Sequence, residues 1–366
     1  MRVPRAPVPA RSIRSREGKL DLGLHHLTKG DQLRASGNLP DALASVRNAR
    51  KILSRMSRQS PGHEVQRHIA DADNRIGVIL LAQGKPDRAL PALQRELDVR
   101  DKLAKSKPER IDFAYDLSAT YARIGRALLA KGKTAMALQS LRRGKAIAER
   151  LAGKTSHTGL LRNLSVFHDR IGDLLLAEGE PRAALQSYRL SLALARRIAR
   201  RAPDNLNYRC ELSLSHTNVG NALEAMNRLP EAMAEFRASH RIFRQLAAAN
   251  PSSLTCRRYV ATSLGKIGSV LLARKSLSAA LKFICEAQRI FNQLSGVAPE
   301  NVIYKRDLFY CLEKIGEVFE AQRKEKEARQ AYRAAASVAR KLKRLDPNNA
   351  YFKGYLARMR LKIAGA

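Results

Sequence analysis

Residue types that serve in acid–base or metal chemistry gather in one short stretch of the chain, RNLSVFHDRIGDLLLAEG. His168, Asp169 and Asp173 fall within six positions there, and a general acid–base pair or a metal site uses these residue types. Asp169 and Asp173 are four residues apart, so on a helix they share one face. Gly172 interrupts the set, although a glycine inside a helix costs about 1 kcal/mol relative to alanine. The glycine therefore needs a structural explanation.

Gly172 is one of seven glycines that recur at a nearly constant interval. The successive spacings are 47, 48, 47, 48, 48 and 48 residues. Self-similarity at such a period indicates a supersecondary unit that is stacked on copies of itself. We use these glycines as reference positions below: Gly30, Gly77, Gly125, Gly172, Gly220, Gly268 and Gly316.

Apolar residues surround each reference glycine at helical spacing. The positions eight before, one before and three after it are apolar in nearly every copy, as Leu164, Ile171 and Leu175 are in the fourth. These offsets lie on one side of a helix with 3.6 residues per turn, so each unit is expected to begin with an amphipathic helix. In four copies another glycine follows seven residues later, and in three of these a proline comes soon after, which indicates a helix end and a new helix start.

A second amphipathic helix completes each unit, and no strand pattern is visible. Every copy has alanine twelve residues after the reference glycine and a large apolar residue four further on. A proline 31 residues after the glycine closes every copy except the third, which has Ser156 there. Small residues let two helices pack closely, so we interpret two columns as structural: Gly77, Gly125, Gly172, Gly220, Gly268 and Gly316, with Ala89, Ala137, Ala184, Ala232, Ala280 and Ala328.

This pattern resembles the tetratricopeptide repeat (TPR) family over about nine tenths of the chain. The family's helix-turn-helix signature is read in the fourth copy as Ile171, Gly172, Leu175, Ala184, Tyr188 and Pro203. The departure is length, because these units have 47 or 48 residues whereas the common repeat has about 34. The resemblance is to the long-repeat type found in bacterial proteins.

The resemblance implies an all-α fold, an α-solenoid that winds as a right-handed superhelix of seven repeats plus a C-terminal capping helix. Residues 1–19 form a basic segment that we expect to be disordered. The predicted capping helix repeats the first-helix pattern with Tyr351, Leu356 and Ile363. The predicted repeats span residues 20–61, 62–108, 109–156, 157–203, 204–251, 252–299 and 300–346, and the capping helix spans 347–366.

Family members hold peptides or partner helices in a concave groove that their first helices line. Carried over column by column, this implies a mixed groove that is acidic toward its C-terminal end. The implied groove residues are Asn74, Val78, Leu81, Arg126, Leu129, Asp169, Asp173, Leu176, Thr217, Asn221, Glu224, Ser269, Leu272, Glu313, Glu317 and Glu320.

The repeat changes the interpretation of the acid–base stretch. His168 occupies a column that also holds His26, Tyr121 and Leu264, which is not a functional column. Asp169 and Asp173 could pair as ligands or as acid and base, or they could be a solvated groove wall that meets a basic partner. The chain has no Gly-rich phosphate loop, no Gly-x-Ser-x-Gly and no His-Glu-x-x-His. We expect no catalytic residues, no metal and no cofactor.

Net charge is the outlier of the composition. The chain has 68 Lys plus Arg against 33 Asp plus Glu, a formal charge of +35. The surplus is either compositional and solubilising, or it forms a polyanion-binding edge for a nucleic acid, an acidic protein or a membrane surface. Aromatic residues make up only 5% and tryptophan is absent, which speaks against base stacking. A predicted basic ridge comprises Arg67, Arg162, Arg209, Arg257, Lys305, Lys353, Arg150 and Arg197.

The remaining features bound the location and class of the protein. No apolar run reaches the roughly 18 residues of a membrane span, so we expect a cytoplasmic protein, with a transit peptide as the alternative for the basic N-terminal segment. The four cysteines show no paired spacing and are expected to be small core residues. The favoured function is a protein-interaction scaffold with an unidentified peptide or helix as partner, and the alternative is binding of a nucleic acid or another polyanion.

Overall fold

The computed structural model describes residues 15–60, 62–153, 157–347 and 349–365, and every regular element in these ranges is an α-helix. Residues 1–14 of the expected basic tail and Ser156 lie outside the described residues. The helices are α1 Arg16–Ala35, α2 Leu39–Gln59, α3 His63–Ala82, α4 Pro86–Ser106, α5 Ile111–Ala130, α6 Thr134–Ala152, α7 Thr158–Ala177, α8 Pro181–Arg201, α9 Leu206–Ala225, α10 Leu229–Ala249, α11 Leu254–Ala273, α12 Leu277–Val297, α13 Val302–Ala321, α14 Glu325–Leu345 and α15 Ala350–Gly365.

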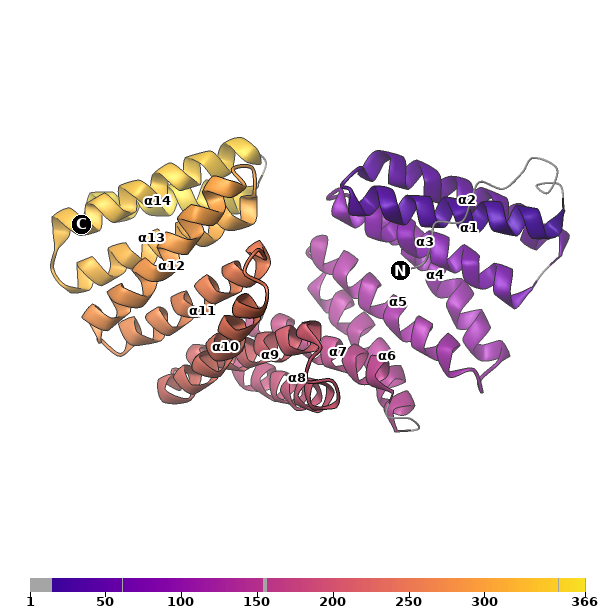
Figure 1. Cartoon of the computed structure of the whole chain (residues 1–366), viewed down its shortest axis with the longest axis horizontal. Helices are drawn as coiled ribbons and strands as arrows, with labels where there is room; N and C mark the ends of the chain where they lie inside the picture. The colour runs from indigo at the N-terminus through magenta and orange to yellow at the C-terminus, as the bar shows by residue number, and fades with distance from the viewer. Residues whose placement is uncertain (1–14, 61, 154–156, 348, 366) are drawn as a thin grey trace. The chain divides into compact units, whose positions relative to one another are not determined.

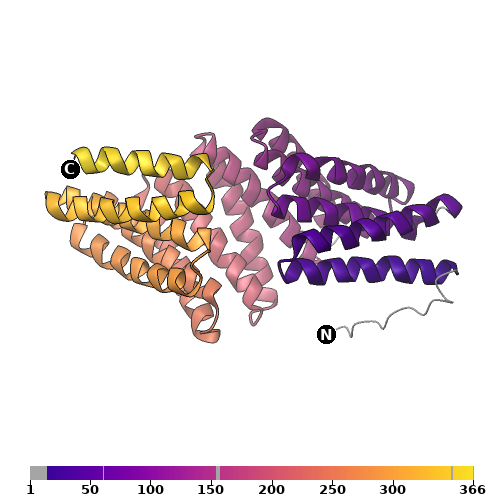
Figure 2. The same ribbon diagram turned by 90° about the horizontal axis from the view of Figure 1, so that it is seen from above.

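Within each of two units of the chain, consecutive helices pack as antiparallel pairs stacked in series (Figure 1). The chain divides into two units, residues 1–174 and 175–366, with the division inside α7. In the first unit α1 packs on α2, α2 on α3, and so on to α6; in the second the same order runs from α8 to α15. In Figure 2 the last helices of the second unit lie side by side. The predicted all-α solenoid fold is confirmed, and the described residues contain fifteen helices, the number that seven pairs and a final helix require.

The reference glycines make room for a large side chain of the partner helix. An ideal Cβ added at Gly77 would lie 2.5 Å from Cδ2 of Leu93, and one added at Gly220 would lie 2.5 Å from Cε1 of Phe236. Both neighbours follow their glycine by sixteen residues and are buried. The alanine twelve residues after the glycine is fully buried too, as Ala89 is. The glycine therefore makes room for the side chain one turn beyond the alanine, and it also lies close to the alanine's backbone, since a Cβ added at Gly268 would be 3.4 Å from the carbonyl oxygen of Ala280.

The turn within each pair needs a left-handed residue seven positions after the reference glycine. Glycine fills it in four copies, for example Gly84 at φ 69°. Asn227, Lys275 and Arg323 adopt φ of 56°, 58° and 60° at the equivalent position. The next amide reaches back to the carbonyl of the last turn, as Lys85 does to Leu80 at 2.9 Å, which is the Schellman geometry. A non-glycine residue in this conformation is strained.

The two ends of the described chain differ from the prediction in detail. Helix α1 begins at Arg16 with Ser15 as its N-cap, so the last residues of the expected tail are helical. In α15 the predicted apolar stripe is wrong for Tyr351, which is 77% exposed, because the helix buries Phe352, Tyr355 and Met359 instead. The ring of Tyr355 stacks on that of Phe309 with centroids 4.5 Å apart. Helix α15 thus covers the apolar side of the last pair, as a cap must.

The cysteine prediction holds for only part of the set. Cys311 is buried, and burial raises its pKa to about 12. Cys210 and Cys256 are half-buried, whereas Cys285 is exposed and does not belong to the core. All four are free thiols.

Candidate functional site

The implied groove residues lie on one face of the first helices, at positions three before, one after and four after the reference glycine. We call this the first-helix face. In the first unit its members Asn74, Val78 and Leu81 are partly exposed, and in the second unit Thr217 and Asn221 are too. Partial exposure of these members, next to buried neighbours such as Ile76, means that stacking leaves this face open to solvent. The sequence-based placement is wrong for one residue, Glu313, which is buried.

Ion pairs between successive first helices run along this face. In the first unit Arg75 Nε of α3 donates to Asp31 of α1 at 3.0 Å. In the second unit Lys266 Nζ of α11 donates to Glu224 of α9 at 3.4 Å. These pairs join residues 44 and 42 positions apart in the chain, roughly one repeat. The face therefore presents charges that are already partly paired.

The C-terminal end of the face is neutralised by the capping helix. Arg358 of α15 lies 2.6 Å from the carboxylate of Glu313, and Lys362 lies 3.0 Å from that of Glu320. Glu317 pairs with Lys314 of its own helix at 2.7 Å. Helix α15 therefore brings two cations onto these carboxylates and neutralises the negative charge that was predicted for this end of the face. Glu313 is buried in the same contact.

In the acid–base stretch the histidine is buried, whereas one of the two aspartates is exposed. His168 is only 5% exposed, and burial, with the charge of Lys145 adding to it, lowers its pKa. Asp173 is exposed and accepts a hydrogen bond from Arg170 at 3.3 Å. Among the described residues, no three His, Cys, Asp or Glu side chains gather as a metal ion would require. The exposure of Asp173 and the half-burial of Asp169 fit a wall of the first-helix face.

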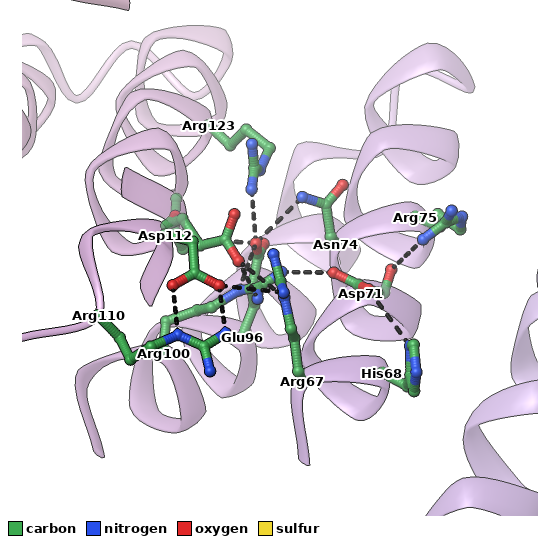
Figure 3. Close-up of polar contacts among 12 residues, drawn as sticks. Arg67, His68, Asp71, Asn74, Arg75, Glu96, Arg100, Arg110, Asp112 and Arg123 are labelled. Carbon is green, nitrogen blue, oxygen red and sulfur yellow. Dashed lines mark hydrogen bonds and ion pairs between the residues drawn. The ribbon is translucent and has the colours of Figure 1, made fainter. Parts of the chain in front are cut away.

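A buried ion-pair network in the first unit joins α3, α4 and α5 (Figure 3). Glu96 of α4 is fully buried, and its Oε1 accepts from Asn74 at 3.0 Å, from Thr120 at 2.9 Å and from Arg123 at 2.7 Å. One carboxylate oxygen thus receives three donors from the helices on either side. Bonds to an ionised group are among the stronger protein hydrogen bonds.

Arg100 provides the buried cation of the same network. It is 3% exposed, and its two terminal nitrogens donate to Asp116 at 2.6 Å and to Asp71 at 2.5 Å. Burial alone would raise the pKa of Asp71, but the hydrogen bond from His68 and the charge of Arg100 outweigh it and hold the pKa at about 2. For Asp116 burial dominates and raises the pKa. The guanidinium therefore bridges α3 and α5 through carboxylates in different environments.

This network was not anticipated, although the sequence carries a signal for it. Glu96 stands nineteen residues after its reference glycine, where the other six copies have only alanine, glycine or serine. Arg100 stands 23 residues after it, in a column otherwise made of alanine, leucine and phenylalanine. Ions in a column of small or apolar residues indicate a specialised repeat. The buried groups at the centre of the network link α3, α4 and α5.

The predicted basic ridge is partly engaged with the chain's own side chains. Arg67 lies 3.2 Å from Asp112 and 3.3 Å from Asp116. Arg209 and Arg257 donate to glutamine side chains of the second helix of their own pair. The other members are exposed or half-exposed: Arg150, Arg162, Arg197, Lys305 and Lys353. Polyanion binding by the ridge stays a prediction.

Comparisons with known proteins find the fold but no sequence family. No family model matches the sequence, and no curated protein sequence matches it either. Solved structures do share the architecture. RapI in its apo form is 15% identical, with 88% of this chain and 99% of that chain covered and a TM-score of 0.59. No helix of the described residues combines the length and apolarity that crossing a bilayer requires.

Two further structures share the architecture. A signal transduction ATPase with numerous domains from Pyrococcus horikoshii, described as having a tetratricopeptide repeat sensor, is 13% identical, with 96% of this chain and 53% of that chain covered and a TM-score of 0.55. The nuclear import adaptor Nro1 of S. pombe is 10% identical, with 80% and 99% covered and a TM-score of 0.52. At these identities the likeness concerns the fold.

Proposed function

Because the chain has the fold of the tetratricopeptide-repeat proteins, we propose that it is a non-catalytic scaffold that holds a peptide or helix of a partner protein on its first-helix face. The observation that carries the proposal is the solvent exposure of that face in helices whose other sides are buried. A stacked repeat must bury the sides that meet its neighbours, so the face left open is the one available to a partner.

The chemistry of the face suits a peptide better than a small molecule. Ser269 of α11 offers a side-chain hydroxyl group, and Asn221 of α9 and Leu272 of α11 are partly exposed. The hydroxyl of Thr217 is already bonded to the carbonyl of Ser213 and to the hydroxyl of Ser239. Hydroxyl side chains such as that of Ser269 can pair with the peptide backbone as donor and as acceptor. The similarity to a nuclear import adaptor supports a role in holding another protein.

A site-specific photo-crosslinker tests the proposal. A benzophenone amino acid would replace Ser269 on the first-helix face of α11, and the matched control would replace Arg289, which is exposed on the second helix α12 of the same pair. After irradiation in the native host and purification, we expect a protein adduct at position 269 and none at position 289. Adducts at 289 alone would place the partner on the other side of the repeats and defeat the proposal.

A further inference from the structure

A second surface in the first unit is distinct from the first-helix face. The second helices α2 and α4 each pack on α3 and leave a groove of about 900 Å³ between them. Ile76 and Leu80 of α3 form its floor, and Pro91 and Ala92 of α4 add apolar surface to one wall. We call it the basic groove, because seven of its lining residues are Arg or Lys and only Asp87 is acidic.

The cations of α2 run in a line along the groove. Arg47, Lys51, Arg55 and Arg58 are all exposed and line it. Their spacings of four, four and three residues place one cation on each turn of the helix, over a length of about 16 Å. None of the four forms an ion pair with a described residue, so their charge is available to a ligand. A row of this kind matches an elongated anion better than a compact one.

A buried carboxylate fixes two further arginines at the bottom of the groove. Asp73 of α3 is fully buried, and its Oδ1 accepts from Arg50 Nε of α2 at 2.7 Å and from Arg95 of α4 at 3.0 and 2.8 Å. The other oxygen, Oδ2, is buried without a hydrogen-bond partner among the described residues. The two guanidiniums are thereby pre-organised on opposite walls. Both donors of Arg95 reach the same oxygen of Asp73, which Arg50 also reaches, so a single buried oxygen anchors both arginines.

The same groove in the second unit shows that the repeat does not impose this charge. There α8 and α10 flank α9, and the floor residues Val219 and Leu223 occupy the same repeat positions as Ile76 and Leu80. Its walls carry Arg189 and Arg196 opposite Glu231 and Glu235, so the cations face anions. The basic groove lies at the same position in the repeat as its counterpart, but it is larger, about 900 against about 370 Å³, and has no such acidic wall.

From these features we infer that the basic groove binds an acidic amphipathic helix of a partner protein. Glutamates at positions i, i+4, i+8 and i+11 of a helix repeat at the spacing of the cations on α2, and leucines beside them would meet the apolar floor and Pro91. A phosphate polymer would match the charge but leave the apolar surface uncovered. No aromatic residue lines the groove to stack nucleic-acid bases.

A labelled synthetic peptide tests the inference on the full chain. The probe is a 16-residue helical peptide with glutamates at positions 2, 6, 10 and 13 and leucines on the adjoining face, and its control has the same composition in scrambled order. Fluorescence anisotropy at low salt should show that the ordered peptide binds at least about tenfold more tightly than the scrambled one. Equal binding of both peptides, or no binding of the ordered one, would overturn the inference.

Two matched double variants locate the site. R47E/R55E reverses the row on α2, and R189E/R196E reverses the same number of charges in the counterpart groove of the second unit. We expect the first to weaken peptide binding by about tenfold or more and the second to leave it within about twofold. R47Q/R55Q should weaken it less than R47E/R55E does, and circular dichroism should show unchanged helicity for all three. Equal losses for the two charge reversals would mean that net charge alone attracts the peptide.

Inorganic polyphosphate provides the last comparison. If it bound more tightly than the ordered peptide and lost that affinity in R47E/R55E, the groove would be a phosphate site and the helix assignment would be wrong. The photo-crosslinking test concerns the first-helix face, so the proposed function and the inference about the basic groove can each be refuted without the other.

Discussion

Replacing Arg100 with methionine removes the buried cation of the α3–α4–α5 network while keeping an unbranched side chain of similar length. Arg100 is 3% exposed and donates two short hydrogen bonds, to Asp71 at 2.5 Å and to Asp116 at 2.6 Å. Hydrogen bonds to charged groups contribute about 1.5–3 kcal/mol each, and removing one partner of a buried pair costs about 3–5 kcal/mol. We therefore expect R100M to lower the free energy of unfolding by about 3–5 kcal/mol at pH 7.

Urea denaturation followed by circular dichroism measures this loss, and hydrogen exchange in α4 and α5 localises it. The control is K102M on the same helix, because Lys102 is exposed and its loss should cost less than about 0.5 kcal/mol. Without Arg100, the carboxylates of Asp71 and Asp116 repel each other, so protonating them below about pH 4 should shrink the difference from the unmodified protein. A loss under about 1 kcal/mol, or an equal loss at pH 3 and pH 7, would refute the reasoning.

Three further substitutions test separate features of the repeats. D71N removes a carboxylate whose pKa is lowered to about 2 in the folded protein. A lowered pKa stabilises the fold at pH values above the pKa of the unfolded chain, so we expect D71N to lower the free energy of unfolding by about 2.5 kcal/mol at neutral pH. Urea titrations should show this difference fading between pH 4 and pH 2. G77A places a methyl group 2.5 Å from Leu93 Cδ2 and should cost about 1–3 kcal/mol in thermal unfolding. K275G relieves a left-handed residue at φ 58° and should raise stability by about 0.5–1 kcal/mol, whereas a loss would show that the lysine side chain contributes more than the strain.

The fold could be predicted from the sequence because each helix pair contacts only its neighbours in the chain. The columns around Gly77, Gly125 and the other reference glycines repeat the same short-range packing problem seven times, so periodicity alone indicated the helices and the turns between them. The left-handed turn position was visible only where glycine occupies it. At Lys275 the backbone takes the same conformation in the short turn that joins the packed helices α11 and α12.

The first-helix face could be assigned by column, but its charge could not. The sequence places Glu313, Glu317 and Glu320 together and predicts an acidic end. The structure pairs Glu313 with Arg358, 45 residues later, because the capping helix lies where the first helix of another repeat would lie. Aligning equivalent positions of the repeats does not show which side chain of the next helix contacts a given residue.

Sequence periodicity by itself determined that this chain is a stack of helix pairs, since burial of an amphipathic stripe depends on residue type and spacing alone. Only the tertiary structure decided that Glu96 and Arg100 form a buried network and that Arg50 and Arg95 converge on Asp73 between α2 and α4. The physical reason is that Coulomb and hydrogen-bond energies depend on distances of a few ångströms between side chains of different helices. Those distances follow from how the helices pack and which rotamers the packing allows.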